Sequence, residues 1–287
     1  MNKLILLALS LFYFDLTVAQ EARTAPIGFD QYRTHIERGR LDTASYRSET
    51  VGNDRQVLVY TPPSYDKTKS YPVLYLLHGI GGDEFEWLRN GVPQIILDNL
   101  YADKKIQPMI VVLPNGRAMK DDSASGNIMD VDKVQAFATF EKDLLQDLIP
   151  FIEKSYAVKK DQTSRALFGL SMGGGQALNF GLGNLTVFGW VGGFSSAPNT
   201  RKPEHLLPNP QEAKNKLKLL WISCGDQDGL MVNSERTHEY LTKYQVPHVF
   251  YVEPGGHDFK VWKNDLYMVA QLLFKNLNYS ELEYLNR

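Results

Sequence analysis

A five-residue motif, Gly169-Leu170-Ser171-Met172-Gly173, constrains the fold of this chain more than any other feature. An apolar run, residues 166–168, precedes it, and a small-residue stretch typical of a helix follows it. A strand, a sharp turn and a helix in this order form a nucleophile elbow, in which glycines flank the serine because larger side chains would clash. The motif therefore predicts a strand-to-helix turn that exposes the Ser171 hydroxyl.

Alternating strand and helix patterns run through the rest of the chain and predict an α/β fold. Because helical segments separate the strands, the sheet should be mainly parallel, with helices on both faces. Residues 20–45 are polar and predict an irregular surface lead-in, and no linker divides residues 20–287, so we expect one domain. Strands are expected at 56–60, 71–77, 109–113, 165–170, 187–194, 217–223 and 248–252, and helices at about 92–101, 137–154, 172–182, 233–244 and 262–277.

A base and an acid for Ser171 occur later in the chain, in the order that α/β-hydrolases use. Of the six histidines, only His257 follows the last expected strand, in a glycine-rich turn before the final helix. Asp226 and Asp228 both lie in the turn after the strand at 217–223, and their position alone does not choose between them. One of them should orient His257, while the other stabilises the turn.

The glycine-rich segment at 78–82 closes the strand before the first helix, where backbone amides can face a developing oxyanion. We assign the two oxyanion donors to the amides of Ile80 and Met172. His78 is interpreted as a structural hydrogen-bonding residue. The chemistry expected of these residues is serine-based ester cleavage, which needs no cofactor.

Charge and cysteine content exclude several other classes of function. The chain has 287 residues, 43% of them hydrophobic, and a formal net charge of -2 with scattered cations, which argues against nucleic acid partners. Cys224 is the only cysteine, so no disulfide can form within the chain, and we expect a buried free thiol rather than a nucleophile. The histidines show no metal-ligand spacing, and no metal is expected.

Residues 1–19 have the pattern of a cleaved signal peptide. Lys3 precedes an apolar stretch, and Thr17-Val18-Ala19 suits a cleavage site. The alternative is a membrane anchor, but Asp15 interrupts a segment shorter than the ~20 apolar residues that a spanning helix needs. We therefore expect a periplasmic or secreted protein without a membrane segment after cleavage.

Four motifs in register resemble the esterase D-like group, most closely the bacterial feruloyl esterases of carbohydrate esterase family 1. The resemblance runs over residues 46–277, and the motifs lie at 76–82, 169–175, 224–228 and 255–262. It implies an α/β-hydrolase fold and selects Asp228 as the acid. It also implies hydrolysis of feruloyl or related hydroxycinnamoyl esters on plant cell-wall arabinoxylan through an acyl-enzyme.

Other activities remain open on the same scaffold, because a fold does not fix the acyl group. They are acetylxylan or other short-acyl ester hydrolysis, acyl transfer to an alcohol, and carbohydrate binding without turnover. For an aromatic acyl group we expect an apolar slot formed by Trp87, Leu230 and Trp262, with core packing as the alternative for each. The loop at 115–134 does not match the family pattern, which leaves its role open.

Overall fold

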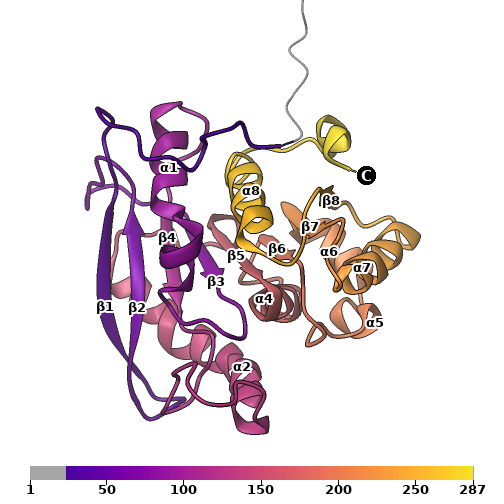
Figure 1. Ribbon diagram of the computed structural model, residues 1–287, viewed down its shortest axis with the longest axis horizontal. Coiled ribbons are helices and arrows are strands. Elements are labelled where there is room, and N and C mark those ends of the chain that lie inside the picture. Colours follow the sequence, from indigo (N-terminus) through magenta and orange to yellow (C-terminus); the bar gives the residue numbers. More distant parts are fainter. Residues whose placement is uncertain (1–23, 287) are drawn as a thin grey trace, which may run out of the picture.

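The apolar runs form the inner strands of an eight-stranded sheet with the order β1-β2-β4-β3-β5-β6-β7-β8 (Figure 1). The computed structural model describes residues 24–286. β1 pairs with β2, and β2 with β4, in antiparallel fashion, while all other neighbours are parallel. The strands are β1 Arg40–Ser48, β2 Asn53–Thr61, β3 Val73–Leu77, β4 Ile110–Pro114, β5 Arg165–Leu170, β6 Trp190–Phe194, β7 Leu219–Gly225 and β8 Val249–Glu253.

Helices cover both faces of this sheet, which confirms the expected α/β-hydrolase architecture. The α-helices are α1 Pro93–Ala102, α2 Val131–Asp143, α3 Ile149–Ser155, α4 Ser171–Gly183, α5 Pro203–Leu206, α6 Pro210–Lys216, α7 Met231–Lys243 and α8 Phe259–Ala270. Short π-helical segments, η1 Trp87–Gly91 and η2 Leu144–Leu148, and 3₁₀-helical segments, η3 Gln162–Ser164 and η4 Tyr279–Leu285, also occur.

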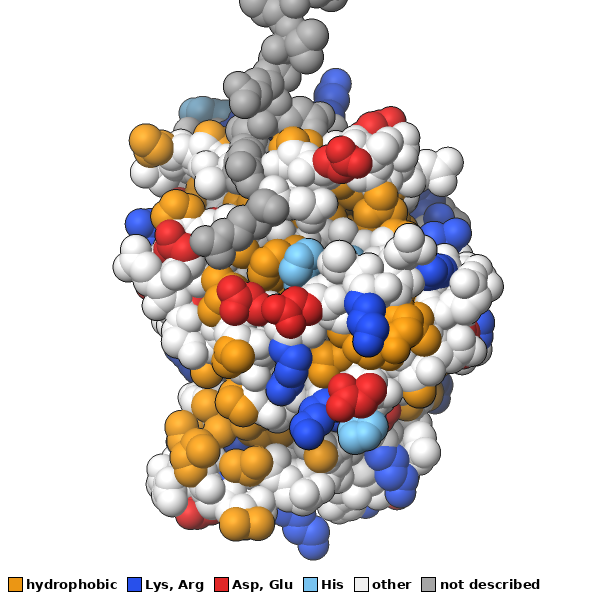
Figure 2. Space-filling view, turned by 90° about the vertical axis from the view of Figure 1, so that its right-hand side faces the viewer, with side chains coloured by type: hydrophobic (Ala, Val, Ile, Leu, Met, Phe, Trp, Pro, Cys, Tyr) orange, Lys and Arg blue, Asp and Glu red, His pale blue; other side chains and the backbone are white. Residues whose placement is uncertain are grey.

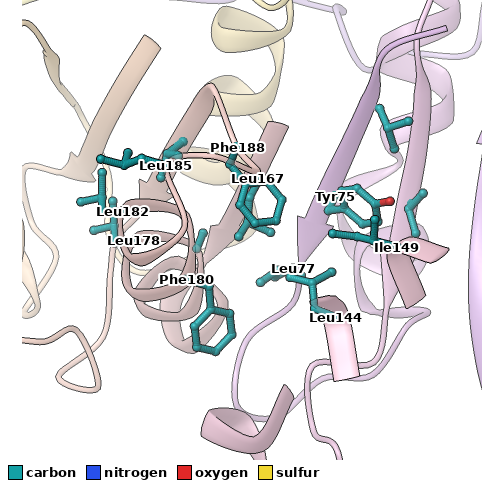
Figure 3. Packing of buried hydrophobic residues seen from close by; sticks show 14 of the residues in the cluster. Tyr75, Leu77, Leu144, Ile149, Leu167, Leu178, Phe180, Leu182, Leu185 and Phe188 are labelled. Atoms are coloured by element: carbon teal, nitrogen blue, oxygen red, sulfur yellow. The ribbon is translucent and has the colours of Figure 1, made fainter. Parts of the chain in front are cut away.

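Strand side chains alternate between two apolar cores, one on each face. On β3, Tyr75 and Leu77 point into a core with α2, α3, α4 and α7, whereas Leu74 and Leu76 point into a core with α1 and α8. Figure 3 shows the first core, where β3 side chains face Leu144 and Phe180 from the covering helices. Burial on both faces explains why the inner strands read as continuous apolar runs.

Two expectations about local structure are wrong. The polar segment at 20–45 contains most of β1, an edge strand in which only Tyr46 and Ser48 are buried. The expected single helix at 137–154 is three consecutive pieces, because the π-helical turn η2 separates α2 from α3 and α2 begins earlier. The other expected elements are present, most with ends shifted by a few residues, but the last helix ends at Ala270 rather than at 277.

The loops that carry the predicted chemistry lie at one edge of the sheet. Ser171 follows β5, Asp228 follows β7 and His257 follows β8. The loops after β3 and β4 reach the same edge, because β3 lies between β4 and β5 and all five strands run parallel. Carboxyl ends of parallel strands are where such sheets bind ligands.

Within residues 24–286, no helix has the length and apolarity needed to cross a membrane. The predicted signal peptide, residues 1–19, lies outside the described residues. Acidic and basic side chains are interspersed on the face seen in Figure 2. This mixture of signs fits the small net charge of -2.

Candidate active site

The turn between β5 and α4 holds Ser171 in a left-handed backbone conformation, with φ of 51°. Such a φ is uncommon for residues other than glycine and marks a site where surrounding structure enforces the turn. A Cβ on Gly169 would lie 2.5 Å from the Gly173 backbone, and a Cβ on Gly173 would lie 2.4 Å from the His78 carbonyl oxygen. Both positions therefore require glycine, and the turn has the elbow geometry that the motif predicted.

A chain of two hydrogen bonds joins Ser171, His257 and Asp228. His257 Nε2 lies 2.9 Å from Ser171 Oγ, and His257 Nδ1 lies 2.8 Å from Asp228 Oδ2. When the imidazole is neutral with its proton on Nδ1, it donates to the carboxylate and can accept the serine proton at Nε2. The arrangement can thus transfer a proton from the Ser171 hydroxyl to an imidazole whose tautomer the carboxylate fixes.

The structure also separates the two aspartates between which position alone did not choose. Asp228 is 5% exposed, and its Oδ1 accepts a hydrogen bond of 2.8 Å from the Leu230 amide. Burial alone would raise the pKa of Asp228, but hydrogen bonds from His257 and the Leu230 amide lower it overall. Asp226 is exposed, and its carboxylate accepts a bond from the Gly255 amide at 2.9 Å, which ties together the two loops.

The segment at 79–82, which we call the oxyanion loop, follows β3 and forms a tight turn closed by the Gly82 amide and the Gly79 carbonyl, 3.1 Å apart. No hydrogen bond from the Ile80 amide is found among the described residues. Met172 is the second residue of α4, where backbone amides have no intrahelical partner. Both predicted donors therefore belong to backbone that can offer a free N–H, one from the loop after β3 and one from α4.

His78 links this loop to the segment after β4 by hydrogen bonds at both ring nitrogens. Its Nδ1 lies 2.7 Å from the Gly79 carbonyl oxygen, to which it donates, and its Nε2 accepts from the Gly116 amide at 2.8 Å. Burial lowers the pKa of His78 to about 4, so the ring is neutral near pH 7. These bonds agree with a structural role for His78.

The three residues expected to form an apolar slot have different surroundings. Trp87 is a core residue: it is 1% exposed, and its indole N–H donates to the Leu77 carbonyl at 3.0 Å, so its expected place in a slot is wrong. Trp262 is 6% exposed and packs edge-on against the His257 ring at 4.9 Å, where it supports the imidazole. Leu230 is half-buried beside Asp228.

Three residues near the site were not identified from the sequence. Glu86 accepts a hydrogen bond from the Gly79 amide at 2.8 Å, and Arg117 donates to the Ile80 carbonyl at 2.5 Å. Ile128 Cδ1 lies 3.9 Å from where a Cβ on Gly81 would stand. Arg117 and Ile128 come from the loop at 115–134. Two sequence signals pointed to this region: the length of the loop after a strand end, where such sheets place ligands, and its departure from the family pattern.

Neither a metal centre nor a reactive thiol emerges from the described residues. Within 24–286, no group of three or more His, Cys, Asp or Glu side chains could hold a metal ion. Cys224 is buried, and burial, together with the negative charge of Asp228, raises the pKa of its thiol to about 12. A thiol with so high a pKa is a poor nucleophile near neutral pH.

Comparisons with known proteins identify relatives of this chain. The family model described as "Putative esterase" matches residues 48–272. An endo-1,4-beta-xylanase/feruloyl esterase of Xylanibacter ruminicola is 32% identical over 252 residues, which cover 86% of this chain and 33% of that protein. The endo-1,4-beta-xylanase Y of Acetivibrio thermocellus is 29% identical over 56% of this chain and 14% of its own length. The chain thus spans a third or less of these two relatives.

Among solved structures, a ferulic acid esterase of Anaeromyces mucronatus, in complex with ferulic acid, superposes with a TM-score of 0.79 at 25% identity. The match covers 90% of this chain and 99% of that one. The family model covers more than half of the chain, and the fold agrees with that of the solved relative. The chain therefore belongs to this esterase family and has the α/β-hydrolase fold.

Proposed function

We propose that this chain is an exported serine esterase that removes feruloyl or related hydroxycinnamoyl groups from plant cell-wall arabinoxylan. One observation carries the proposal: the hydrogen-bonded chain from Ser171 through His257 to Asp228, at distances of 2.9 and 2.8 Å. The relative from Xylanibacter ruminicola, whose name includes feruloyl esterase, and the ferulic acid complex of the Anaeromyces mucronatus enzyme support the choice of acyl group.

The proposed mechanism begins when Ser171 Oγ attacks the ester carbonyl carbon while His257 Nε2 takes the hydroxyl proton. Negative charge then develops on the carbonyl oxygen, and the amides of Ile80 and Met172 donate hydrogen bonds to it. Collapse of this intermediate breaks the bond to the sugar oxygen, which leaves as an alcohol with the proton from His257. The product of this half-reaction is a feruloyl ester of Ser171.

Water completes the cycle by the same steps in reverse. His257 Nε2 accepts a proton from the attacking water, and the second tetrahedral intermediate expels Ser171, which regains its proton from the imidazole. Asp228 keeps the imidazole proton on Nδ1 and stabilises the imidazolium that forms in both halves. No step requires a cofactor.

Apolar side chains near the oxyanion loop support an aromatic acyl group. Ile128 lies beside Gly81, and its neighbours Met129 and Val131 are 63% and 86% exposed. Leu230 is half-buried on the Asp228 side. We propose that these residues, rather than Trp87, contact the hydroxycinnamoyl ring, since apolar side chains near such a site usually supply acyl-group affinity.

A substrate comparison tests the proposal directly. We expect hydrolysis of methyl ferulate and of feruloylated arabinoxylan oligosaccharides, with weak release of acetate from acetylated xylan. Ser171→Ala should lower ester turnover by at least ~10³-fold while leaving the far-ultraviolet circular dichroism and the melting temperature near wild type. Strong deacetylation with little ferulate release would overturn the acyl-group assignment, and full activity in Ser171→Ala would overturn the mechanism.

Two matched variants test the proposed contact between Ile128 and the hydroxycinnamoyl ring. Ile128→Ala should lower kcat/KM for methyl ferulate by about 5- to 20-fold, because a lost apolar contact is worth roughly 1–2 kcal/mol, and should change acetate ester hydrolysis little. Val232→Ala removes another exposed apolar side chain, on α7, and serves as the control. Export is tested separately by sequencing the amino terminus of the protein from culture fractions, where cleavage after Ala19 is expected.

A further inference from the structure

Three successive peptide groups of the oxyanion loop are each fixed by a different side chain. The amide of Gly79 donates to Glu86 Oε2 at 2.8 Å. The carbonyl of Gly79 accepts from His78 Nδ1 at 2.7 Å, and the carbonyl of Ile80 accepts from Arg117 Nη2 at 2.5 Å. The Ile80 N–H belongs to the middle peptide group, so its direction is fixed by that group and by both of its neighbours.

Arg117 reaches the oxyanion loop from the neighbouring strand end, after β4, and is itself firmly held. It is 0% exposed, and its guanidinium also donates to the carbonyl oxygens of Gly82, at 3.4 Å, and Asp122, at 2.9 Å. It lies 5.0 Å from the centre of the Phe137 ring. A planar guanidinium can donate in several fixed directions at once, which a lysine cannot do.

The buried charge of Arg117 also needs an explanation, because burying a cation is costly unless it is compensated. Burial lowers the pKa of Arg117, and the nearby carboxylates of Asp122 and Asp83 offset this only in part. A guanidinium nevertheless stays protonated in proteins. Its positive charge therefore lies beside the Ile80 carbonyl, in the peptide group that directly follows the one carrying the Ile80 N–H.

We propose that Arg117 and Glu86 are positioning residues that aim the Ile80 N–H at the oxyanion formed during ester cleavage. The proposal rests on the proposed esterase function and gives the loop at 115–134 a role: its first residues hold the oxyanion loop from behind. Because the donor matters most in the transition state, loss of either side chain acts on kcat more than on KM. Misplacement of a catalytic group by about 1 Å costs on the order of 10²-fold in rate.

The central experiment compares two buried arginines. Arg117→Met should lower kcat for methyl ferulate about 10- to 100-fold with KM within about threefold, and Arg117→Lys should restore part of the loss. Arg165→Met is the matched control, because Arg165 is 6% exposed and also donates to backbone carbonyls, those of Val187 and Lys160, at the start of β5 and away from the site. The control should lower the melting temperature and leave kcat within about threefold.

Binding measurements separate positioning from general damage. An arylboronic acid forms a tetrahedral adduct on an active serine, so its affinity should fall in Arg117→Met in proportion to kcat, whereas inhibition by ferulate should stay within about threefold. Unchanged kcat in a folded Arg117→Met protein would overturn the proposal. An equal loss of boronate and ferulate affinity would overturn it as well, because it would indicate a collapsed site.

Glu86 provides a second test if Arg117→Met does not fold. Glu86 is half-buried at the entry to η1, and Glu86→Ala removes the acceptor for the Gly79 amide. We expect a kcat loss of about 5- to 30-fold in Glu86→Ala and recovery in Glu86→Gln, whose amide oxygen can accept the same bond. Wild-type kcat in Glu86→Ala would contradict the proposal. Absence of ester hydrolysis by the wild-type chain would instead refute the proposed function, so the two failures are distinguishable.

Discussion

Two aspartates near Cys224 are similarly buried but differ in their hydrogen-bond partners. Asp228 is 5% exposed, and both of its carboxylate oxygens accept hydrogen bonds, from His257 Nδ1 and from the Leu230 amide. Asp265, on α8, is 0% exposed, and neither of its oxygens has a partner at normal hydrogen-bond geometry among the described residues. The Ser223 hydroxyl and the Trp221 indole N–H face it without such a bond.

This difference decides which carboxyl group carries a charge. Burial alone would raise the pKa of Asp228, but the donors around it lower that pKa overall. Burial and the neighbouring Glu253 carboxyl raise the pKa of Asp265 well above its usual range, and burial raises the pKa of Glu253 to about 8. Burial alone therefore does not decide whether an aspartate is ionised, because hydrogen-bond donors around the carboxylate also shift its pKa. The ionised aspartate is the one that can orient an imidazole.

Removing the charge of Asp228 should have the largest effect. Asp228→Asn keeps the size of the side chain but no longer stabilises the imidazolium or fixes its tautomer, and we expect kcat to fall about 10³- to 10⁴-fold with little change in KM. Asp226→Asn, two residues away and exposed, is the control and should stay within about threefold of wild type. Steady-state kinetics with methyl ferulate measure both. Equal losses in the two variants would contradict the assignment of Asp228.

Replacing either buried carboxyl group, that of Asp265 or that of Glu253, by a neutral amide should instead increase the free energy of unfolding near pH 8. With a folded-state pKa of about 8 for Glu253 and an ordinary value in the unfolded chain, the native state holds more protons between about pH 5 and 8. The free energy of unfolding of the wild-type chain should therefore fall as pH rises through this window. Asp265→Asn or Glu253→Gln should flatten this dependence and raise the melting temperature at pH 8 by on the order of 5 °C.

Calorimetry at pH 5 and pH 8 measures this effect, and kcat serves as its control. We expect kcat within about threefold of wild type, because no hydrogen bond joins Asp265 to the Ser171, His257 and Asp228 chain among the described residues. A melting temperature of Asp265→Asn that rises no more at pH 8 than at pH 5 would show that the native carboxyl is ionised at both. The contrast with Asp228 would then fail.

Local sequence patterns predicted most of the fold and singled out Ser171 and His257, whereas the family resemblance selected Asp228 over Asp226. Continuous apolar runs marked the inner strands because these are buried on both faces, and the order of Ser171, Asp228 and His257 followed the strand ends. β1 was missed because an edge strand needs few apolar residues, and only Tyr46 and Ser48 of its nine residues are buried. Pairing with β2, which no local pattern encodes, makes it a strand.

The direction of individual side chains was the second feature that the sequence could not predict. Trp87 follows the glycine-rich loop without any periodicity around it, so nothing local indicates that the π-helical turn η1 directs its ring into the core. Arg117 shows the opposite problem, since a single arginine in a loop is usually solvated. Only the meeting of two loops from neighbouring strands buries it against the oxyanion loop. Both placements depend on tertiary contacts between distant segments.

The smallest effect on activity is expected from substitution of Cys224, which lies near both Asp228 and Asp265. Burial comes first among the causes that raise the pKa of its thiol to about 12, and both Asp228 and Asp265 add to it. The native thiol should therefore resist alkylation by iodoacetamide at pH 8 and react only after unfolding, and Cys224→Ala should keep kcat within about threefold. Mass spectrometry after timed alkylation measures the first, and ester hydrolysis the second. Rapid alkylation of the folded chain would contradict the burial of Cys224 and the raised pKa of its thiol.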